Sequence, residues 1–174
     1  MKLIIKKWSA IIRKVFVAGT FDIIQPGHTF FINEAAKLGE VYAIVATDKN
    51  RERISGKLPI ISEEQRLEVI KNLKNVKKAK LGTDNINILL SVSEINPDII
   101  LLGPDQRFDI KRLKEALKKM KLGHIEVKRL NKYYDKYKLN SSSMIKKKII
   151  ESNDNKDSKL KREKANYSII YEKI

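Results

Sequence analysis

The chain has 174 residues and a formal net charge of +16, from 37 Lys and Arg against 21 Asp and Glu. It contains no cysteine and only two histidines, which excludes disulfides, a cysteine nucleophile and a histidine-rich metal site. An apolar share of 42% excludes a fully disordered chain, and no apolar run is long enough for a transmembrane helix. The length predicts one domain, and the lysine-interrupted start argues against a signal peptide, so we expect a cytoplasmic protein.

Apolar patterns typical of strands and helices alternate along most of the chain. The expected strands are Val15–Ala18, Val41–Ala46, Val76–Leu81, Asp98–Leu102 and His124–Leu130. The expected helices are Gly27–Leu38, one opened by the capping-box sequence Ser62-Glu63-Glu64-Gln65, Ile86–Ile95, Phe108–Met120 and Ser141–Glu151. The polar stretches Thr47–Ile61 and Asn131–Asn140 are expected to be loops. This alternation predicts an α/β fold, a Rossmann-like doubly wound parallel sheet of five strands with helices on both faces.

Three segments differ in composition. Residues 1–14 form a basic extension, expected to cap the domain, with a membrane-surface or oligomer contact as the alternative. Residues 15–150 form the expected domain, and residues 151–174 form a polar tail that contains the strand-like run Tyr167–Tyr171.

The positive charge is concentrated in one part of the chain. Residues 111–148 hold 14 Lys and Arg against three acids, which leaves +11. An excess of this size indicates an anionic partner or a solvated cationic face. Nucleic acid and a small phosphate ligand both satisfy this requirement, and charge alone does not separate them.

The segment GTFDIIQPGH, residues 19–28, follows the first predicted strand and opens a helix. A helix N-terminus presents free N–H groups and a partial positive charge, which suits a phosphate. Gly27 would let a phosphate approach the backbone, and His28 in the first turn could donate to one of its oxygens. On spacing alone, a tight turn with a structural histidine is equally compatible.

The pattern GTFDxxxxGH resembles the signature of the nucleotidylyltransferase superfamily (cytidylyltransferase-like), whose usual form is GTFDxxHxGH. Within that superfamily, the sequences GPDQ with a nearby Phe108-Asp109 and KLPIISEEQR are most similar to archaeal FAD synthetases. The resemblance covers residues 15–150 and implies the HxGH-type nucleotidylyltransferase fold. Three further motifs occur in the family's order: Lys57-Leu58-Pro59-Ile60 followed by Glu64 and Arg66, Leu102-Gly103-Pro104-Asp105-Gln106, and Ser141-Ser142-Ser143-Met144-Ile145-Lys146.

The resemblance implies that a substrate phosphate attacks the α-phosphate of a nucleoside triphosphate and releases pyrophosphate. The most similar subgroup implies FAD synthetase activity, the transfer of AMP from ATP to FMN, with Mg²⁺ as the default metal. The expected partners are therefore small molecules; a homodimer stays open, and neither a membrane nor nucleic acid is the favoured partner. The alternatives are a glycerol-3-phosphate cytidylyltransferase, a phosphopantetheine adenylyltransferase, or a non-catalytic nucleotide- or nucleic-acid-binding protein. The choice between ATP and CTP is not settled by the sequence.

The resemblance also implies roles for individual residues. His28, Gln25 and Lys57 are the expected catalytic residues, and Lys57 and Arg66 would contact the substrate phosphate. Asp22 would support its loop or hold a metal through water. The expected nucleotide-binding residues are Gly19, Thr20, Phe21, Gly27, His28, Gly103, Asp105, Gln106, Ser141, Ser142 and Ser143.

The sequence departs from the family pattern at Gln25, and the role of three tyrosines stays open. Gln25 stands where the family usually has the first histidine of HxGH, and glutamine keeps an amide donor but carries no positive charge. Retuned or reduced activity is one expectation from this change. Tyr133, Tyr134 and Tyr137 could stack on a base or a flavin ring, or could be ordinary packing residues.

Overall fold

A five-stranded parallel sheet lies at the centre of the fold, in the order β3-β2-β1-β4-β5. Its strands are β1 (Lys14–Gly19), β2 (Glu40–Val45), β3 (Val76–Leu81), β4 (Ile99–Leu102) and β5 (Glu126–Arg129). The predicted class, a Rossmann-like α/β fold with a five-stranded parallel sheet, is confirmed. Each strand differs from its predicted bounds by at most two residues at either end.

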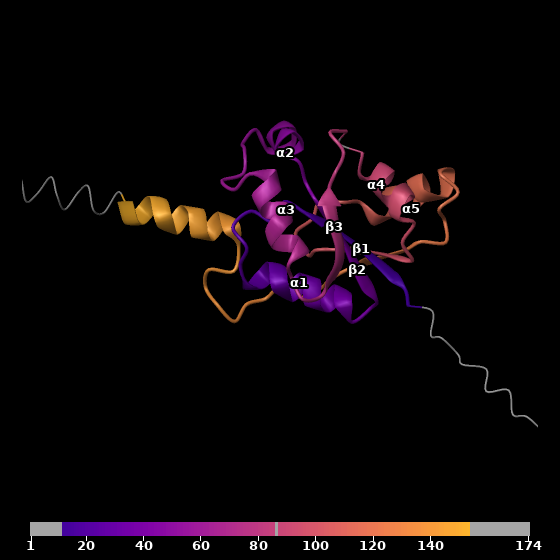
Figure 1. Ribbon diagram of the computed structural model, residues 1–174, viewed down its shortest axis with the longest axis horizontal. Helices are drawn as coiled ribbons and strands as arrows, with labels where there is room; N and C mark the ends of the chain where they lie inside the picture. Colours follow the sequence, from indigo (N-terminus) through magenta and orange to yellow (C-terminus); the bar gives the residue numbers. More distant parts are fainter. Residues whose placement is uncertain (1–11, 86, 154–174) are drawn as a thin grey trace, which may run out of the picture. The chain divides into compact units, whose positions relative to one another are not determined.

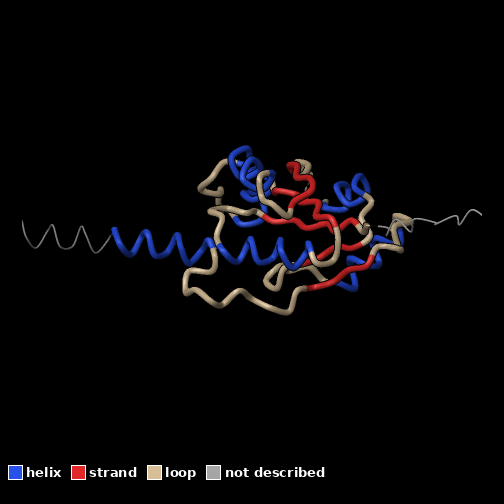
Figure 2. Tube along the Cα trace, turned by 60° about the horizontal axis from the view of Figure 1, so that its bottom comes forward, coloured by secondary structure: helices blue, strands red, loops and turns tan. Residues whose placement is uncertain are grey.

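Helices pack on both faces of this sheet, as Figure 1 shows. These helices are α1 (Pro26–Ala36), α3 (Glu63–Lys71), α4 (Ile88–Ile95) and α5 (Ile110–Lys119). One core joins α1 and α3 to the sheet, and a second core joins α4 and α5 to its other face. In Figure 2 the strands, in red, run between the blue helices.

The alternating pleat of β1 explains why the sheet has two cores. Val15 and Val17 belong to the core with α1 and α3, whereas Phe16 belongs to the core with α4 and α5. All three side chains are at most 1% exposed. A strand buried on both faces is typical of a parallel sheet and reads as a continuous apolar run.

The expectation of a loop over Thr47–Ile61 is wrong at its start, because α2 (Asp48–Ser55) is a helix. Thr47 accepts a hydrogen bond from the N–H of Asn50 as its N-cap. Gly56 ends it in the left-handed conformation, with φ of 67°. Only Asn50 is buried in α2, so the helix has no apolar stripe that sequence periodicity could reveal.

The structure is a computed structural model that describes residues 12–85 and 87–153. It divides into two compact units, residues 1–134 and 135–174. The second unit contains a helix over 142–153, where the sequence predicts one from Ser141 to Glu151. The run Tyr167–Tyr171 and most of the basic extension lie outside the described residues. The predicted domain boundaries stay predictions.

Candidate active site

The sheet reverses its winding direction between β1 and β4, which pair side by side. In open α/β sheets, ligands bind at this switch point, beyond the carboxyl ends of the strands. The loop that follows β1 and the loop that follows β4 carry two of the sequence motifs, and Gln106 links them. Its Nε2 donates to the carbonyl of Ala18 at 2.6 Å, and its Oε1 accepts from the N–H of Gly103 at 2.8 Å.

Gln106 therefore joins the two loops through both ends of its side-chain amide. The sequence predicts that Gln106 contacts the nucleotide. In this structure its side-chain amide is hydrogen-bonded to backbone groups, whereas the side chain of the neighbouring Asp105 is exposed. We interpret Gln106 as a positioning residue and keep Asp105 as the candidate for ligand contact.

The turn after β1 brings Phe21 back over the end of its own strand. Phe21 has a φ of 55°, an uncommon conformation for a bulky residue. Its ring lies so close to Gly19 that a Cβ at position 19 would be 2.9 Å from the ring's Cζ. The same ring meets the imidazole of His28 edge-on, with centroids 5.6 Å apart. Gly19, Phe21 and His28 thus pack against one another, and their part in nucleotide binding stays a prediction.

His28 lies in the first turn of α1, and its Nδ1 is buried with no hydrogen-bond partner among the described residues. Burial lowers the pKa of His28 below its usual value of 6.5, although the charges of Asp105 and Asp22 act to raise it. The side chain is therefore neutral near pH 7. It can donate or accept a hydrogen bond but does not bring a full positive charge to a phosphate.

This lowered pKa predicts a pH dependence of stability. The unfolded chain binds a proton at His28 below about pH 6.5, whereas the folded chain binds it only at lower pH. The contribution of His28 to the free energy of unfolding is therefore complete above about pH 6.5. It falls as the pH drops from there toward the lower pKa of the folded chain. We expect His28→Asn to lose less unfolding free energy than the native chain between pH 7.5 and 5.5, measured by urea denaturation. An equal loss in both proteins would contradict the assignment.

Gln25 is the N-cap residue of α1 and binds the helix start with both its side chain and its backbone. Its Oε1 accepts from the N–H of Gly27 at 2.5 Å, and its carbonyl accepts from the N–H groups of His28 and Thr29. The donors that the sequence assigned to a phosphate are thus bonded to Gln25 in this structure. A phosphate at this helix start would have to replace the Gln25 side-chain oxygen on Gly27.

Asp22 and Arg66 hold the loop between α2 and α3, residues 56–62, against the end of β1. The two carboxylate oxygens of Asp22 accept from the N–H groups of Ile60 and Ile61, each at 3.0 Å. The guanidinium of Arg66 donates to the carbonyls of Ile61 at 2.9 Å and Thr20 at 2.5 Å. We call these two side chains the Asp22–Arg66 clasp.

The structure gives Arg66 a different role from the expected phosphate contact. Arg66 is 0% exposed, and its remaining guanidinium nitrogen pairs with Asp48 at 2.5 Å. Its donors therefore serve protein oxygens on three segments, so we treat it as a positioning residue. Lys57, by contrast, is exposed on the α2–α3 loop, where a substrate phosphate could reach it.

Sequence reasoning missed Arg129, which ends β5. Its guanidinium donates to the carbonyls of Gly103 at 3.0 Å, Gln106 at 2.6 Å and Phe108 at 2.6 Å. This one side chain therefore shapes the loop after β4. No local pattern could have identified it, because an arginine at the end of a short strand is an ordinary solvated residue in sequence terms.

Ser141, Ser142 and Ser143 belong to the second unit and open its helix over 142–153. The hydroxyl of Ser141 accepts from the N–H of Met144 at 3.3 Å, as an N-cap serine does. Their part in nucleotide binding stays a prediction.

Among the candidate stacking residues, Tyr134 packs its ring against Phe30 with centroids 5.5 Å apart, whereas Tyr133 is 64% exposed.

The described side chains do not fit a resident metal ion. Residues 12–85 and 87–153 contain no cluster of three or more His, Asp or Glu side chains with metal-binding geometry. Asp22, the candidate ligand, is 4% exposed, and both of its carboxylate oxygens accept hydrogen bonds from backbone N–H groups.

Within residues 12–85 and 87–153, no helix is both long and apolar enough to cross a membrane.

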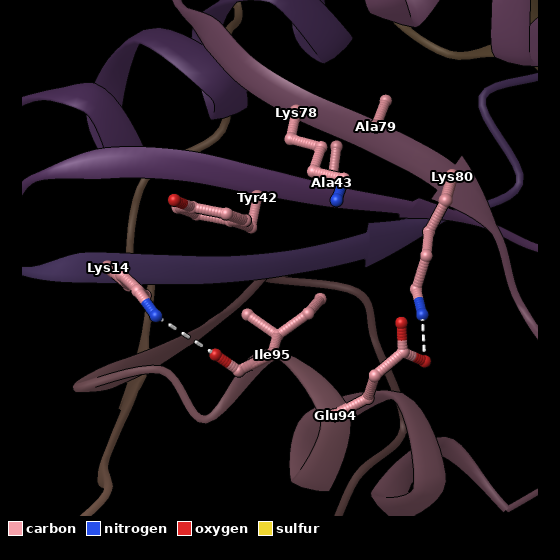
Figure 3. A pocket seen from close by; sticks show the side chains of 8 residues that line it. All are labelled: Lys14, Tyr42, Ala43, Lys78, Ala79, Lys80, Glu94 and Ile95. Carbon is pink, nitrogen blue, oxygen red and sulfur yellow. Dashed lines mark hydrogen bonds and ion pairs between the residues drawn. The ribbon is translucent and has the colours of Figure 1, made fainter.

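A cavity of about 190 Å³ lies elsewhere, on the sheet face that α4 covers. Figure 3 shows Lys14 donating to the carbonyl of Ile95, and Lys80 pairing with Glu94. Two of the cavity's three lysines are thus bonded within the protein. None of the predicted site residues lines this cavity, so we do not assign it to the site.

Comparison with known proteins identifies the family of this chain. The model of the cytidylyltransferase-like family matches residues 16–148. The FAD synthase of Methanobrevibacter smithii is 45% identical over 141 residues, covering 79% of this chain and 90% of the relative. The FAD synthase of Thermococcus sibiricus is 43% identical over 140 residues, covering 80% and 93%.

A solved structure is also similar. The crystal structure described as the lipopolysaccharide core biosynthesis protein from Thermoplasma volcanium is 38% identical, with a TM-score of 0.66. The similarity covers 71% of this chain and 99% of that one. The family match spans most of the chain. This chain therefore belongs to the cytidylyltransferase-like family of nucleotidylyltransferases.

Proposed function

We propose that this protein is an FAD synthase, which transfers AMP from ATP to FMN and releases pyrophosphate. The observation that carries the proposal is the likeness to archaeal FAD synthases at 43–45% identity over about four fifths of the chain. The loops after β1 and β4 support it, because they place the GTFDxxxxGH and GPDQ motifs at the switch point of one sheet.

The reaction requires little covalent chemistry from the protein. A phosphate oxygen of FMN attacks the α-phosphorus of ATP, the new P–O bond forms, and the bond to the β-phosphate oxygen breaks. Pyrophosphate leaves with that electron pair. The attacking phosphate is already ionised near neutral pH, so no general base is needed. Catalysis then depends on positioning and on stabilising the charge that develops on the α-phosphate.

Three of the described side chains would contact the reacting phosphates or make room for them. His28 would donate a hydrogen bond to the triphosphate from the first turn of α1, and Gln25 would move its side-chain oxygen away from Gly27 as the phosphate arrives. Lys57 would neutralise charge on the α-phosphate or on the FMN phosphate. Mg²⁺ would take part as the Mg²⁺ salt of ATP, a substrate in which the triphosphate oxygens hold the ion.

The acceptor is tested by pyrophosphate release. The purified protein is incubated with Mg²⁺ and ATP together with FMN, glycerol 3-phosphate or phosphopantetheine, in separate reactions. We expect release only with FMN. Release only with another acceptor would overturn the FMN assignment, and release without any acceptor would indicate ATP hydrolysis instead.

A cytoplasmic location and a homodimer are further proposals. Size-exclusion chromatography with light scattering tests whether the protein is a homodimer.

Lys57→Ala is expected to lower turnover at saturating substrates by at least about 10-fold, because a positive charge near the reacting phosphates is removed. Because the side chain of Lys57 is exposed, the variant should keep the stability of the native chain, and thermal unfolding checks this. The matched control is Lys71→Ala, which removes an equal charge from the last turn of α3. Equal turnover in the two variants would remove Lys57 from the catalytic residues.

A further inference from the structure

The α2–α3 loop holds apolar side chains in solvent next to the candidate site. In the described part of the first unit, four aliphatic side chains are more than half exposed. Two of them, Leu58 at 57% and Ile60 at 67%, lie on this loop, and Ile54 at 60% lies at the end of α2 just before it. Single exposed apolar residues need no explanation, but a local group beside a site indicates a binding surface.

The backbone of this loop is fixed at both ends. At its start, Gly56 closes α2 by donating to the carbonyl of Glu52 at 2.7 Å, and the carbonyl of Lys57 accepts from the hydroxyl of Ser55 at 3.0 Å. At its end, the Asp22–Arg66 clasp holds Ile60 and Ile61. Between these two held ends, Leu58 and Ile60 are exposed.

The charge and the apolar surface occur on one short segment. Lys57 directly precedes Leu58, and three residues span at most about 10 Å, so the backbone positions of Lys57 and Ile60 lie within the length of one small ligand. The clasp also joins Ile60 and Ile61 to Asp22, three residues after Gly19 at the end of β1. A ligand on this surface would therefore lie beside the loop that is proposed to hold ATP.

We propose that the α2–α3 loop binds the acceptor FMN, with Lys57 on its phosphate and Leu58 and Ile60 against its isoalloxazine ring. This inference rests on the proposed function and names the acceptor's subsite within it. FMN combines a dianionic phosphate with a large, flat, mostly apolar ring, and the loop offers a cation followed by aliphatic side chains. The three-ring isoalloxazine is larger than the two-ring adenine of ATP, so contact with these aliphatic side chains would favour the acceptor over the nucleotide.

The test uses Leu58→Ser and Ile60→Ser in the full chain. Steady-state FAD formation gives KM for FMN and for ATP, and titration of FMN fluorescence without ATP measures binding directly. We expect each variant to raise KM for FMN by roughly 10-fold, with the fluorescence dissociation constant rising in parallel. The KM for ATP should stay as in the native chain. The matched control is Val69→Ser, an apolar residue of α3 that is 44% exposed and lies outside the loop.

The outcomes separate this inference from the proposed function. If the native chain makes no FAD, the proposed function fails. If it makes FAD while both loop variants keep the native KM and fluorescence titration for FMN, the inference is overturned and the proposed function stands. If the variants instead change the oligomeric state in light scattering and leave FMN binding unchanged, the loop contacts a second copy of the chain, which also overturns the inference.

Discussion

Replacing His28 by alanine is expected to reduce FAD formation by about 10²–10³-fold while the protein stays folded. His28 packs against Phe21 at the start of α1, and its Nδ1 is buried with no partner among the described residues. Because burial lowers the pKa of His28, the imidazole acts near pH 7 as a neutral hydrogen-bonding group. The loss should therefore appear mainly in turnover, measured with both substrates saturating.

The control for this prediction is His28→Asn, which keeps a side-chain amide donor of smaller reach. It should retain more turnover than His28→Ala. A second control is His124→Ala, because His124 contacts Asn96 at 3.1 Å and lies outside the motif loops. Native turnover in His28→Ala, with an unchanged unfolding curve, would remove His28 from the mechanism.

Arg66→Met is expected to lower the free energy of unfolding by about 3 kcal/mol or more, because it removes a buried cation from three oxygen partners. Methionine fills much of the same volume but leaves the carbonyls of Thr20 and Ile61 without donors. It also leaves the carboxylate of Asp48 without its ion pair. Urea denaturation followed by circular dichroism measures the change.

The matched control is Arg112→Met on α5, whose side chain is 85% exposed. Exposed ion pairs contribute little, so this variant should stay within about 0.5 kcal/mol of the native chain. A similar, small change in both variants would show that Arg66 does not hold the structure together. A large loss confined to Arg66→Met would support the clasp.

The fold could be predicted from the sequence because its strongest signals are local. Val15–Ala18 and Asp98–Leu102 are short apolar runs, and such runs between helical patterns specify buried parallel strands. The helix predicted to start at Gly27 begins one residue earlier, at Pro26. The helix α2 was missed because its sequence, DKNRERIS, has no apolar face and is recognisable only by the caps Thr47 and Gly56.

The motifs located the candidate site, but its hydrogen-bond network could not be derived from them. Arg66 bonds to Thr20 across 46 positions in the sequence, and Arg129 bonds to Gly103 across 26. Such pairs depend on which strands lie side by side, and no local pattern encodes that. The sequence also treats Gln25 only as a replacement for histidine, whereas the structure makes it the cap of α1.

The most direct test of the account is chromatography of a reaction that contains the purified protein, FMN and the Mg²⁺ salt of ATP, with CTP in a parallel reaction. We expect FAD with ATP, at a rate that falls sharply in His28→Ala. A flavin–cytidine dinucleotide with CTP and no FAD with ATP would contradict the adenylyl assignment. Absence of any flavin dinucleotide, from a protein shown to be folded, would contradict the proposed function itself.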